Sequence, residues 1–185
     1  MVGKRSRSVG LTMIEIMVGL AVFALISTLA MVILQRGQSN FSAGVAVSSL
    51  RRRASESLDR IAMEVRMGGL STVEVYDEGV LTNTTGDRVD FRKAVGSDGW
   101  EPTWGNKVSF RHVGDEIIRF EIGSGSSVIS QGRIASDVAE LYFERNTDAD
   151  GAEQLLIRLG LQVPHVAGTR PPYASSVHTT VTFRN

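Results

Sequence analysis

The sequence predicts an α+β fold in which one long N-terminal helix packs on an antiparallel β-sheet domain. An apolar run over residues 11–34 is followed by a stripe of apolar residues at helical spacing that ends at Val65. From Thr72 onward, apolar residues recur at every second position, as in strands with one buried face. A chain of 185 residues, 42% of them apolar, is typical of one modest globular domain plus such a helix.

The apolar run at residues 11–34 contains a single charged residue, Glu15. About 20 apolar residues in a helix span the hydrocarbon core of a bilayer, whereas an ordinary secretory signal has an apolar region of about 7–15 residues. The run therefore predicts a membrane-spanning helix. The basic residues that precede it, Lys4, Arg5 and Arg7, favour a cytoplasmic N-terminus and an exported remainder, which in a bacterium means the periplasm.

Glu15 is the unusual residue of this run, because a carboxylate within a membrane is costly unless it is paired. If the chain were cut between Gly10 and Leu11, Leu11 would carry a free amine. A positive charge at the N-terminus of a helix opposes the helix dipole. Glu15 could neutralise that amine, either in its own helix or in a neighbouring one.

The sequence GLTMIE that begins at Gly10, behind a basic leader, resembles the prepilin signature of type IV pilins and type II secretion pseudopilins. The resemblance implies that a membrane aspartyl peptidase, the prepilin peptidase, cuts after Gly10 and methylates the new N-terminus at Leu11. It also implies that Glu15 pairs with the N-terminal amine of an adjacent subunit in a filament. Leu11 stands where the family commonly has an aromatic residue. The alternative is a plain signal anchor with an isolated glutamate.

The predicted organisation has four parts. These are a leader at residues 1–10, the membrane half of the helix at 11–34, an amphipathic second half at 35–69 and a β-rich periplasmic domain at 70–185. The stripe of the second half comprises Leu50, Ala54, Leu58, Ile61 and Val65. The helix should run from Leu11 to about Met67, end at a C-cap formed by Gly68 and Gly69, and measure on the order of 85 Å.

The helix should also lack a proline kink, since no proline precedes Pro102. Many major pilins have a proline where this chain has Val32, so the resemblance favours a minor subunit. The sequences at residues 137–163 and 178–185 resemble the W-type minor pilins and the J-type minor pseudopilins. That resemblance implies a subunit that initiates or caps assembly of a type IV pilus or a type II secretion pseudopilus, with other pilins or pseudopilins and the inner membrane as partners.

Seven β-like runs are predicted beyond the helix, at residues 72–76, 88–91, 107–113, 116–122, 137–144, 154–163 and 177–183. Gly114 and Asp115 separate two of them and predict a hairpin turn. Residues 93–106 are predicted to form a surface loop that holds Trp100 and Trp104. Residues 123–127 (GSGSS) predict a flexible turn, because the lysine and the following helix of a phosphate-binding loop are missing.

The composition gives little support to catalysis or to nucleic-acid binding. There is no HExxH, GxSxG or Walker A motif, and His112, His165 and His178 are scattered. The 20 basic and 20 acidic residues give no net charge, so no nucleic-acid surface is indicated. The chain has no cysteine and must fold without disulfides. A non-enzymatic structural subunit is predicted, and the competing class is a membrane-anchored adhesin or ligand-binding receptor that does not polymerise.

One stretch, residues 146–151, has a pattern that resembles the start of an EF-hand loop, with oxygen-bearing side chains at alternate positions and then glycine. The twelfth position of such a loop would be Ile157 instead of glutamate, which excludes an EF-hand. Asparagine, aspartate and glycine also favour a hairpin turn. Two readings therefore stay open: a plain turn, which the composition favours, and a Ca²⁺ site at Asp148 and Asp150.

Overall fold

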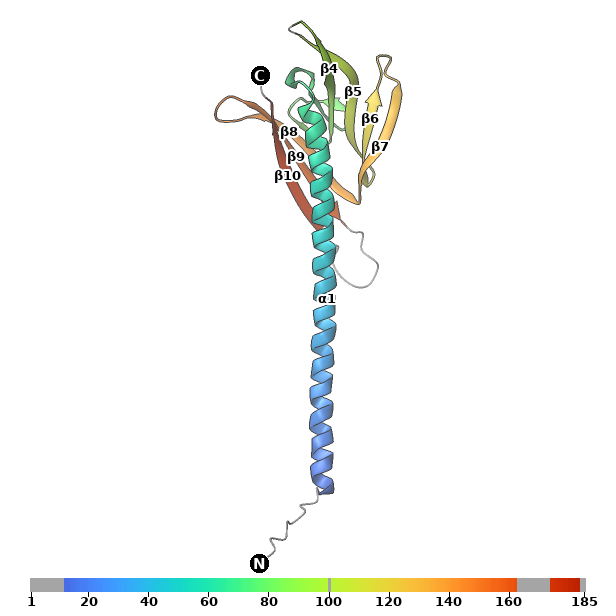
Figure 1. Cartoon of the computed structure of the whole chain (residues 1–185), viewed down its shortest axis with the longest axis vertical. Helices are drawn as coiled ribbons and strands as arrows, with labels where there is room; N and C mark the ends of the chain where they lie inside the picture. The colour runs from blue at the N-terminus through green and yellow to red at the C-terminus, as the bar shows by residue number, and fades with distance from the viewer. Residues whose placement is uncertain (1–11, 100, 163–173, 184–185) are drawn as a thin grey trace, which may run out of the picture. The chain divides into compact units, whose positions relative to one another are not determined.

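The computed structural model describes residues 12–99, 101–162 and 174–183 (Figure 1). Within these residues, one long helix is followed by a 3-10 turn and by strands that form two antiparallel sheets. The predicted α+β class, with a helix packed on a sheet domain, is confirmed. The chain divides into two compact units at Gly44 and Val45, and each unit is described by itself below.

Helix α1 spans Met13–Arg66 and the 3-10 turn η1 spans Leu70–Thr72. The strands are β1 (Glu74–Asp77), β2 (Val80–Leu81), β3 (Thr85–Gly86), β4 (Arg88–Asp98), β5 (Glu101–Val113), β6 (Glu116–Ile122), β7 (Val128–Ser136), β8 (Val138–Thr147), β9 (Glu153–Gln162) and β10 (Ala174–Thr182).

The part of α1 from Met13 to Leu34 is apolar, and no described residue buries it. Every described side chain from Met13 to Leu34 is exposed, including Phe23 at 68%. The helix is long and apolar enough to cross a membrane. The helix begins at Met13, two residues after the predicted start; Thr12 is not helical, and Leu11 lies outside the described residues.

The part of α1 that belongs to the second unit is amphipathic, and its predicted stripe is buried. Leu50, Ala54, Leu58, Ile61 and Val65 are each at most 2% exposed. This part of the helix, coloured cyan to green in Figure 1, lies against the strands of both sheets. The spacing of these residues places them on one face of the helix, so the stripe forms one wall of the core.

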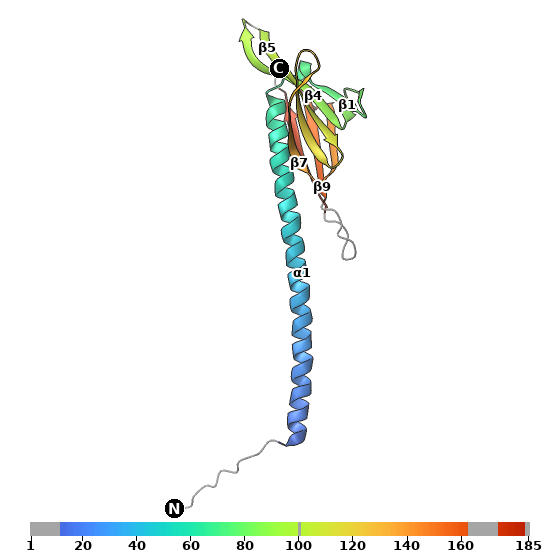
Figure 2. The ribbon, with the colours of Figure 1, turned by 90° about the vertical axis from the view of Figure 1, so that its right-hand side faces the viewer.

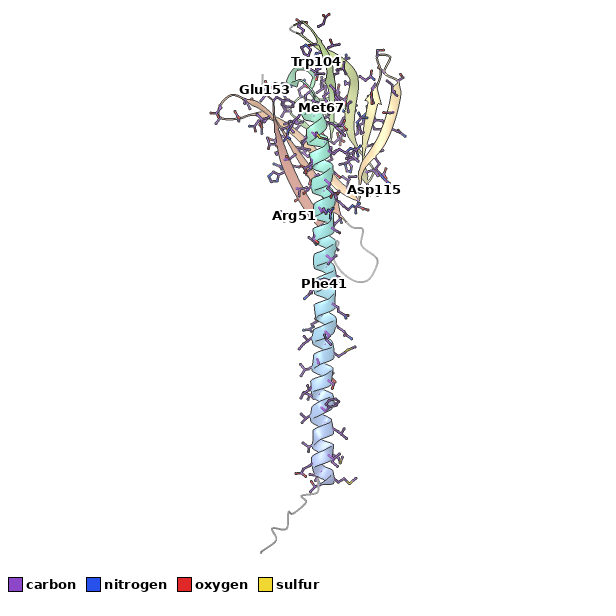
Figure 3. The ribbon with its side chains drawn as sticks, viewed as in Figure 1. Phe41, Arg51, Met67, Trp104, Asp115 and Glu153 are labelled. Atoms are coloured by element: carbon purple, nitrogen blue, oxygen red, sulfur yellow. The ribbon has the colours of Figure 1, made fainter. Side chains whose placement is uncertain are left out.

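The helix ends where predicted, but not through the predicted glycine cap. Neither Gly68 nor Gly69 has a positive φ, so there is no left-handed C-cap. Instead the last turn tightens through bonds such as Gly68 N–H to Val65 C=O, at 2.9 Å. A Cβ on Gly69 would lie 2.2 Å from Cη2 of Trp104. These glycines therefore permit close approach of the sheet, and Figure 3 shows Trp104 near the end of the helix at Met67.

The larger sheet has the strand order β2-β1-β4-β5-β6-β7 and the smaller has the order β10-β9-β8-β3. Within the described residues, every strand pairing is antiparallel. The chain crosses between the sheets three times, at residues 82–84, at Asp87 and at Asp137, which has a φ of 61°. Strands β4 and β7 of the larger sheet and β9 of the smaller can be followed in Figure 2.

The predicted surface loop at residues 93–106 is wrong, because this segment continues strands β4 and β5. The two strands form a hairpin that turns at Gly99, whose φ is 71°. The register shifts twice, between Arg92 and Ala94 and between Ala94 and Gly96. Bulges of this kind break the alternation on which a sequence-based strand prediction depends. Strand β7 was also not predicted, since its residues 128–133 are all exposed and carry no alternating pattern.

The core lies between the inner faces of the two sheets and the packed part of α1. Phe91 of β4 and Phe110 of β5 stack with ring centroids 6.0 Å apart. The predicted alternation of β9 is confirmed by its buried residues, which are Leu155, Ile157, Leu159 and Leu161. Val163, predicted to continue this series, lies outside the described residues. The predicted hairpin at Gly114 is also confirmed, with Val113 opposite Glu116.

Candidate functional site

The first turn of α1 carries the candidate subunit-pairing residue, Glu15. Its Oε2 accepts a hydrogen bond from the backbone N–H of Thr12 at 2.8 Å and another from the Thr12 hydroxyl at 2.9 Å. The backbone N–H of Glu15 donates in turn to Oγ1 of Thr12, at 3.3 Å. This reciprocal arrangement is a capping box, which satisfies amide groups that an α-helix leaves unpaired at its N-terminus.

Thr12 is the site residue that the sequence analysis missed. The signal was available, because a threonine three residues before a glutamate and ahead of an apolar run is the usual sequence of a capping box. The box holds the Glu15 carboxylate at the N-terminal end of α1. In a chain cut after Gly10, the new α-amine would belong to Leu11, the residue directly before Thr12.

The predicted cleavage and methylation residues, Gly10 and Leu11, lie outside the described residues. The contact of Glu15 with an N-terminal amine therefore remains a prediction. The described geometry shows only that the carboxylate faces donors at the start of its own helix. A carboxylate placed there is also favoured by the positive end of the helix dipole.

The segment at residues 146–151 forms the turn between β8 and β9. Oδ1 of Asp148 accepts hydrogen bonds from the backbone N–H groups of Asp150 and Ala152, at 3.0 and 2.8 Å, and its Oδ2 accepts one from Gln154 at 2.8 Å. Gly151 has a φ of 81°, which glycine adopts without strain. Asp148 thus organises the turn with both of its oxygens.

Two glutamates of the adjoining strands lie beside arginines. Glu153 accepts a hydrogen bond at 2.5 Å from Arg145, and Glu144 lies 3.9 Å from Arg158. Among the described residues, no three His, Cys, Asp or Glu side chains come together as a metal-binding group. The hydrogen bonds of Asp148 are sufficient to explain the shape of the turn without a metal ion. The predicted Ca²⁺ site at Asp148 and Asp150 stays a prediction that a titration can test.

The structure does not bring the histidines together within the part of the chain that it describes. His112 on β5 lies 3.4 Å from the carbonyl oxygen of Val138, and His178 is on β10 opposite Arg158. His165 lies outside the described residues.

No family model, curated protein or solved structure matches this chain. The functional argument therefore rests on the chain's own residues. An apolar N-terminal helix followed by an antiparallel sheet domain is compatible with the layout of a pilin.

The most buried charged group, Asp90, belongs to a network on the outer face of the larger sheet. Its carboxylate is held by Arg88 through a bond from Nε at 2.7 Å, by Ser109 at 2.5 Å and by Lys107 at 3.1 Å. Burial raises the pKa of Asp90, but these donors outweigh burial and hold the pKa below its ordinary value. No buried polar side-chain atom among the described residues lacks a hydrogen-bond partner, so the network is satisfied within the sheet and stabilises it.

Proposed function

We propose that this chain is a minor pilin or pseudopilin, a structural subunit that helps to initiate or cap a type IV pilus or a type II secretion pseudopilus. The observation that carries the proposal is Glu15, the one charge of the apolar run, which is held at the N-terminus of α1 and is the fifth residue after Gly10. In a plain membrane anchor the same carboxylate would serve only to cap the helix, and it would do so at the cost of a charge in the apolar run.

Assembly requires three things of the chain: an anchor, a pairing group and a folded head. The exposed apolar surface of α1 up to Leu34 suits lipid before assembly and the helices of other subunits after it. The Glu15 carboxylate already accepts two hydrogen bonds at the helix end, so it can exchange them for the amine of a neighbouring subunit. The sheet domain carries its own core and presents the surfaces that select neighbours.

The proposal places the chain in the inner membrane with its sheet domain in the periplasm, and assembly moves it from the membrane into a filament at the cell surface. Its partners are the prepilin peptidase, other pilins or pseudopilins and the membrane, with no role for nucleic acid or for catalysis. A membrane-anchored adhesin or receptor is the competing class. That class predicts no methylated N-terminus at Leu11.

Cleavage after Gly10 gives the decisive test. A side chain at position 10 should block a peptidase that needs close backbone approach, so Gly10→Val should leave the full precursor of 185 residues in the membrane. Gly19→Val is the matched control, because a Cβ at Gly19 meets no atom within 4 Å, and it should be processed normally. Intact mass spectrometry measures both. Normal trimming of Gly10→Val, or an unmodified Leu11 in the trimmed wild type, would refute the proposal.

A further inference from the structure

A cleft lies between the packed part of α1 and strand β7, within the unit formed by residues 45–185. Its volume is about 370 Å³. Three arginines line it, Arg53 and Arg60 from the helix and Arg133 from β7, together with a single acidic residue, Glu56. We call these residues the arginine cleft. Arg51, which Figure 3 labels, belongs to the same stretch of α1 as Arg53 but does not line the cleft.

The ion pairs around the cleft leave one of its arginines without an acidic partner among the described residues. Arg53 donates at 2.9 Å to both Ser136 and Asp137, which fixes its guanidinium at the start of the β7–β8 crossing. Glu56 is already paired with Arg52, 2.8 Å away and outside the cleft. Arg53 and Arg133 form ion pairs with Asp137 and Glu116, so Arg60 is the one cation of the cleft without an ion-pair partner among the described residues.

Arg60 and Arg133 are the residues most available to a ligand. The side chain of Arg60 forms no hydrogen bond or ion pair with any described residue, and it is exposed. Arg133 pairs with Glu116 at 2.8 Å, but its side chain is 64% exposed. Ion pairs that are this exposed contribute little to stability, so Arg133 can exchange Glu116 for another carboxylate at small cost.

The wall of the cleft that β7 supplies also offers main-chain groups. Strand β7 is the last strand of the larger sheet, so one of its edges has no strand partner among the described residues. An open strand edge accepts an extended peptide through main-chain hydrogen bonds. A volume of 370 Å³ is at the lower end of the range for ligand sites, which admits a few side chains and not a folded domain.

We propose that the arginine cleft receives an extended acidic segment, with aspartate or glutamate side chains, from a neighbouring subunit of the filament. Guanidinium groups bind carboxylates through paired, charge-assisted hydrogen bonds, which give both affinity and orientation. The inference rests on the proposed function for the identity of the partner. The chemistry of the cleft rests on its residues alone.

Binding is tested first with the full chain in neutral detergent micelles, using fluorescein-labelled hexa-aspartate as the probe. The wild type should bind it, and Arg60→Ala should weaken binding roughly tenfold, as expected for the loss of one charge-assisted pair. Arg66→Ala is the matched control, since Arg66 is an exposed arginine of the same helix that does not line the cleft, and it should bind as the wild type does. Equal binding by all three proteins would overturn the proposal.

Two further arms identify the ligand class and separate this inference from the proposed function. If a thymidine hexanucleotide binds through Arg60 more tightly than hexa-aspartate, the assignment to a protein segment is overturned. In cells, Arg60→Glu should be trimmed after Gly10 like the wild type but enter filaments less often. Wild-type incorporation of Arg60→Glu would overturn the cleft, whereas a failure of trimming at Gly10 in the wild type would overturn only the proposed function.

Discussion

Glu64, near the end of α1, accepts a hydrogen bond of 2.9 Å from Nε of Arg119 in β6. Lys93 of β4 lies 2.6 Å from the same carboxylate oxygen. The Glu64 side chain is only 11% exposed, so one helix residue joins two strands of the larger sheet inside a largely dry contact. Burial raises the pKa of Glu64, but the bonds from Lys93 and Arg119 outweigh it and lower the pKa below its ordinary value.

Glu64→Gln should lower the free energy of unfolding by about 1.5–3 kcal/mol, the range for hydrogen bonds to charged groups. It removes the carboxylate that Lys93 and Arg119 share, and it leaves Lys93 without an ion-pair partner among the described residues. Denaturant titration of the full chain in detergent, followed by near-UV circular dichroism, measures this loss. Glu56→Gln is the control, since its pair with Arg52 is 63% exposed and should contribute little. Equal losses in the two variants would contradict the assignment.

The same pair predicts a pH dependence of stability. Because the pKa of Glu64 is lower in the folded chain than in the unfolded one, its contribution is complete at neutral pH. The contribution should decline as the pH falls below the ordinary range of a glutamate, and it should vanish below the folded pKa. The wild type should therefore lose stability in acid more steeply than Glu64→Gln. Parallel curves for the two proteins would show that Glu64 is not the group responsible.

Gly86, at the crossing from the smaller sheet to the larger, should tolerate no side chain. A Cβ there would lie 1.9 Å from the backbone oxygen of Tyr76, and a backbone atom cannot swing aside as a side chain can. Gly86→Ala should therefore cost about 1–3 kcal/mol of stability, as overpacking usually does. Gly132→Ala is the control, because a Cβ there meets nothing within 4 Å, and its melting temperature should stay close to the wild type. A neutral Gly86→Ala would mean that the crossing rearranges.

The helix and the central strands could be predicted because their burial follows a simple period. Leu50, Ala54 and Leu58 share one helix face, and Leu155 and Ile157 share one strand face, so each pattern is visible in a short window. Residues 93–106 could not be predicted in this way. Glycines, a proline and two register shifts interrupt that segment, and its strands are stabilised by cross-strand pairing and by the contact of Trp104 with Gly69.

The same distinction, between features visible in a short stretch of sequence and features that depend on packing, applies to the candidate sites. Glu15 was found because one charge in an apolar run stands out, and its partner Thr12 could have been found from the local spacing. The arginine cleft could not, because Arg60 and Arg133 are distant in sequence and meet only when α1 packs beside β7. Sites built within one turn are readable from sequence, whereas sites built between elements depend on how those elements pack.

Substitutions in the β8–β9 turn distinguish a structural role of its aspartates from a role in Ca²⁺ binding. Asp148→Ala removes three hydrogen bonds that hold the turn, so it should lower stability by about 1–2 kcal/mol without any metal. Asp150→Ala should be neutral without metal, since its side chain is exposed at the tip. If the turn binds Ca²⁺, millimolar calcium should raise the melting temperature of the wild type by mass action. It should not raise the melting temperature of the double variant, which carries both Asp148→Ala and Asp150→Ala. Magnesium should do less, because it demands tighter octahedral geometry.

Calcium-independent melting of the wild type, together with a destabilised Asp148→Ala, would leave the segment as a plain hairpin turn. A calcium shift that survives in the double variant would place the ion elsewhere. Differential scanning fluorimetry of the full chain in detergent distinguishes these results, with each variant compared at equal ionic strength so that general screening is constant.

Glu15→Val should separate membrane insertion from assembly. The substitution removes the only charge of the apolar run, so insertion should be equal or better, and trimming after Gly10 should continue. Incorporation into filaments should fall, because the incoming subunit loses the carboxylate that pairs with the amine of its neighbour. Immunoblots of sheared filaments and of membranes measure incorporation and insertion side by side.

Thr12→Ala decides whether Glu15 acts between subunits or only as a helix cap. This variant removes the hydroxyl that donates to Glu15 and accepts from its backbone N–H, but it keeps the carboxylate and the apolar run. If Glu15 pairs with a neighbouring amine, Thr12→Ala should assemble nearly as well as the wild type, and a charge-preserving Glu15→Asp should retain part of the activity that Glu15→Val loses. Equal defects in Thr12→Ala and Glu15→Val would instead show that the capping box, and not intersubunit pairing, is what assembly requires of this turn.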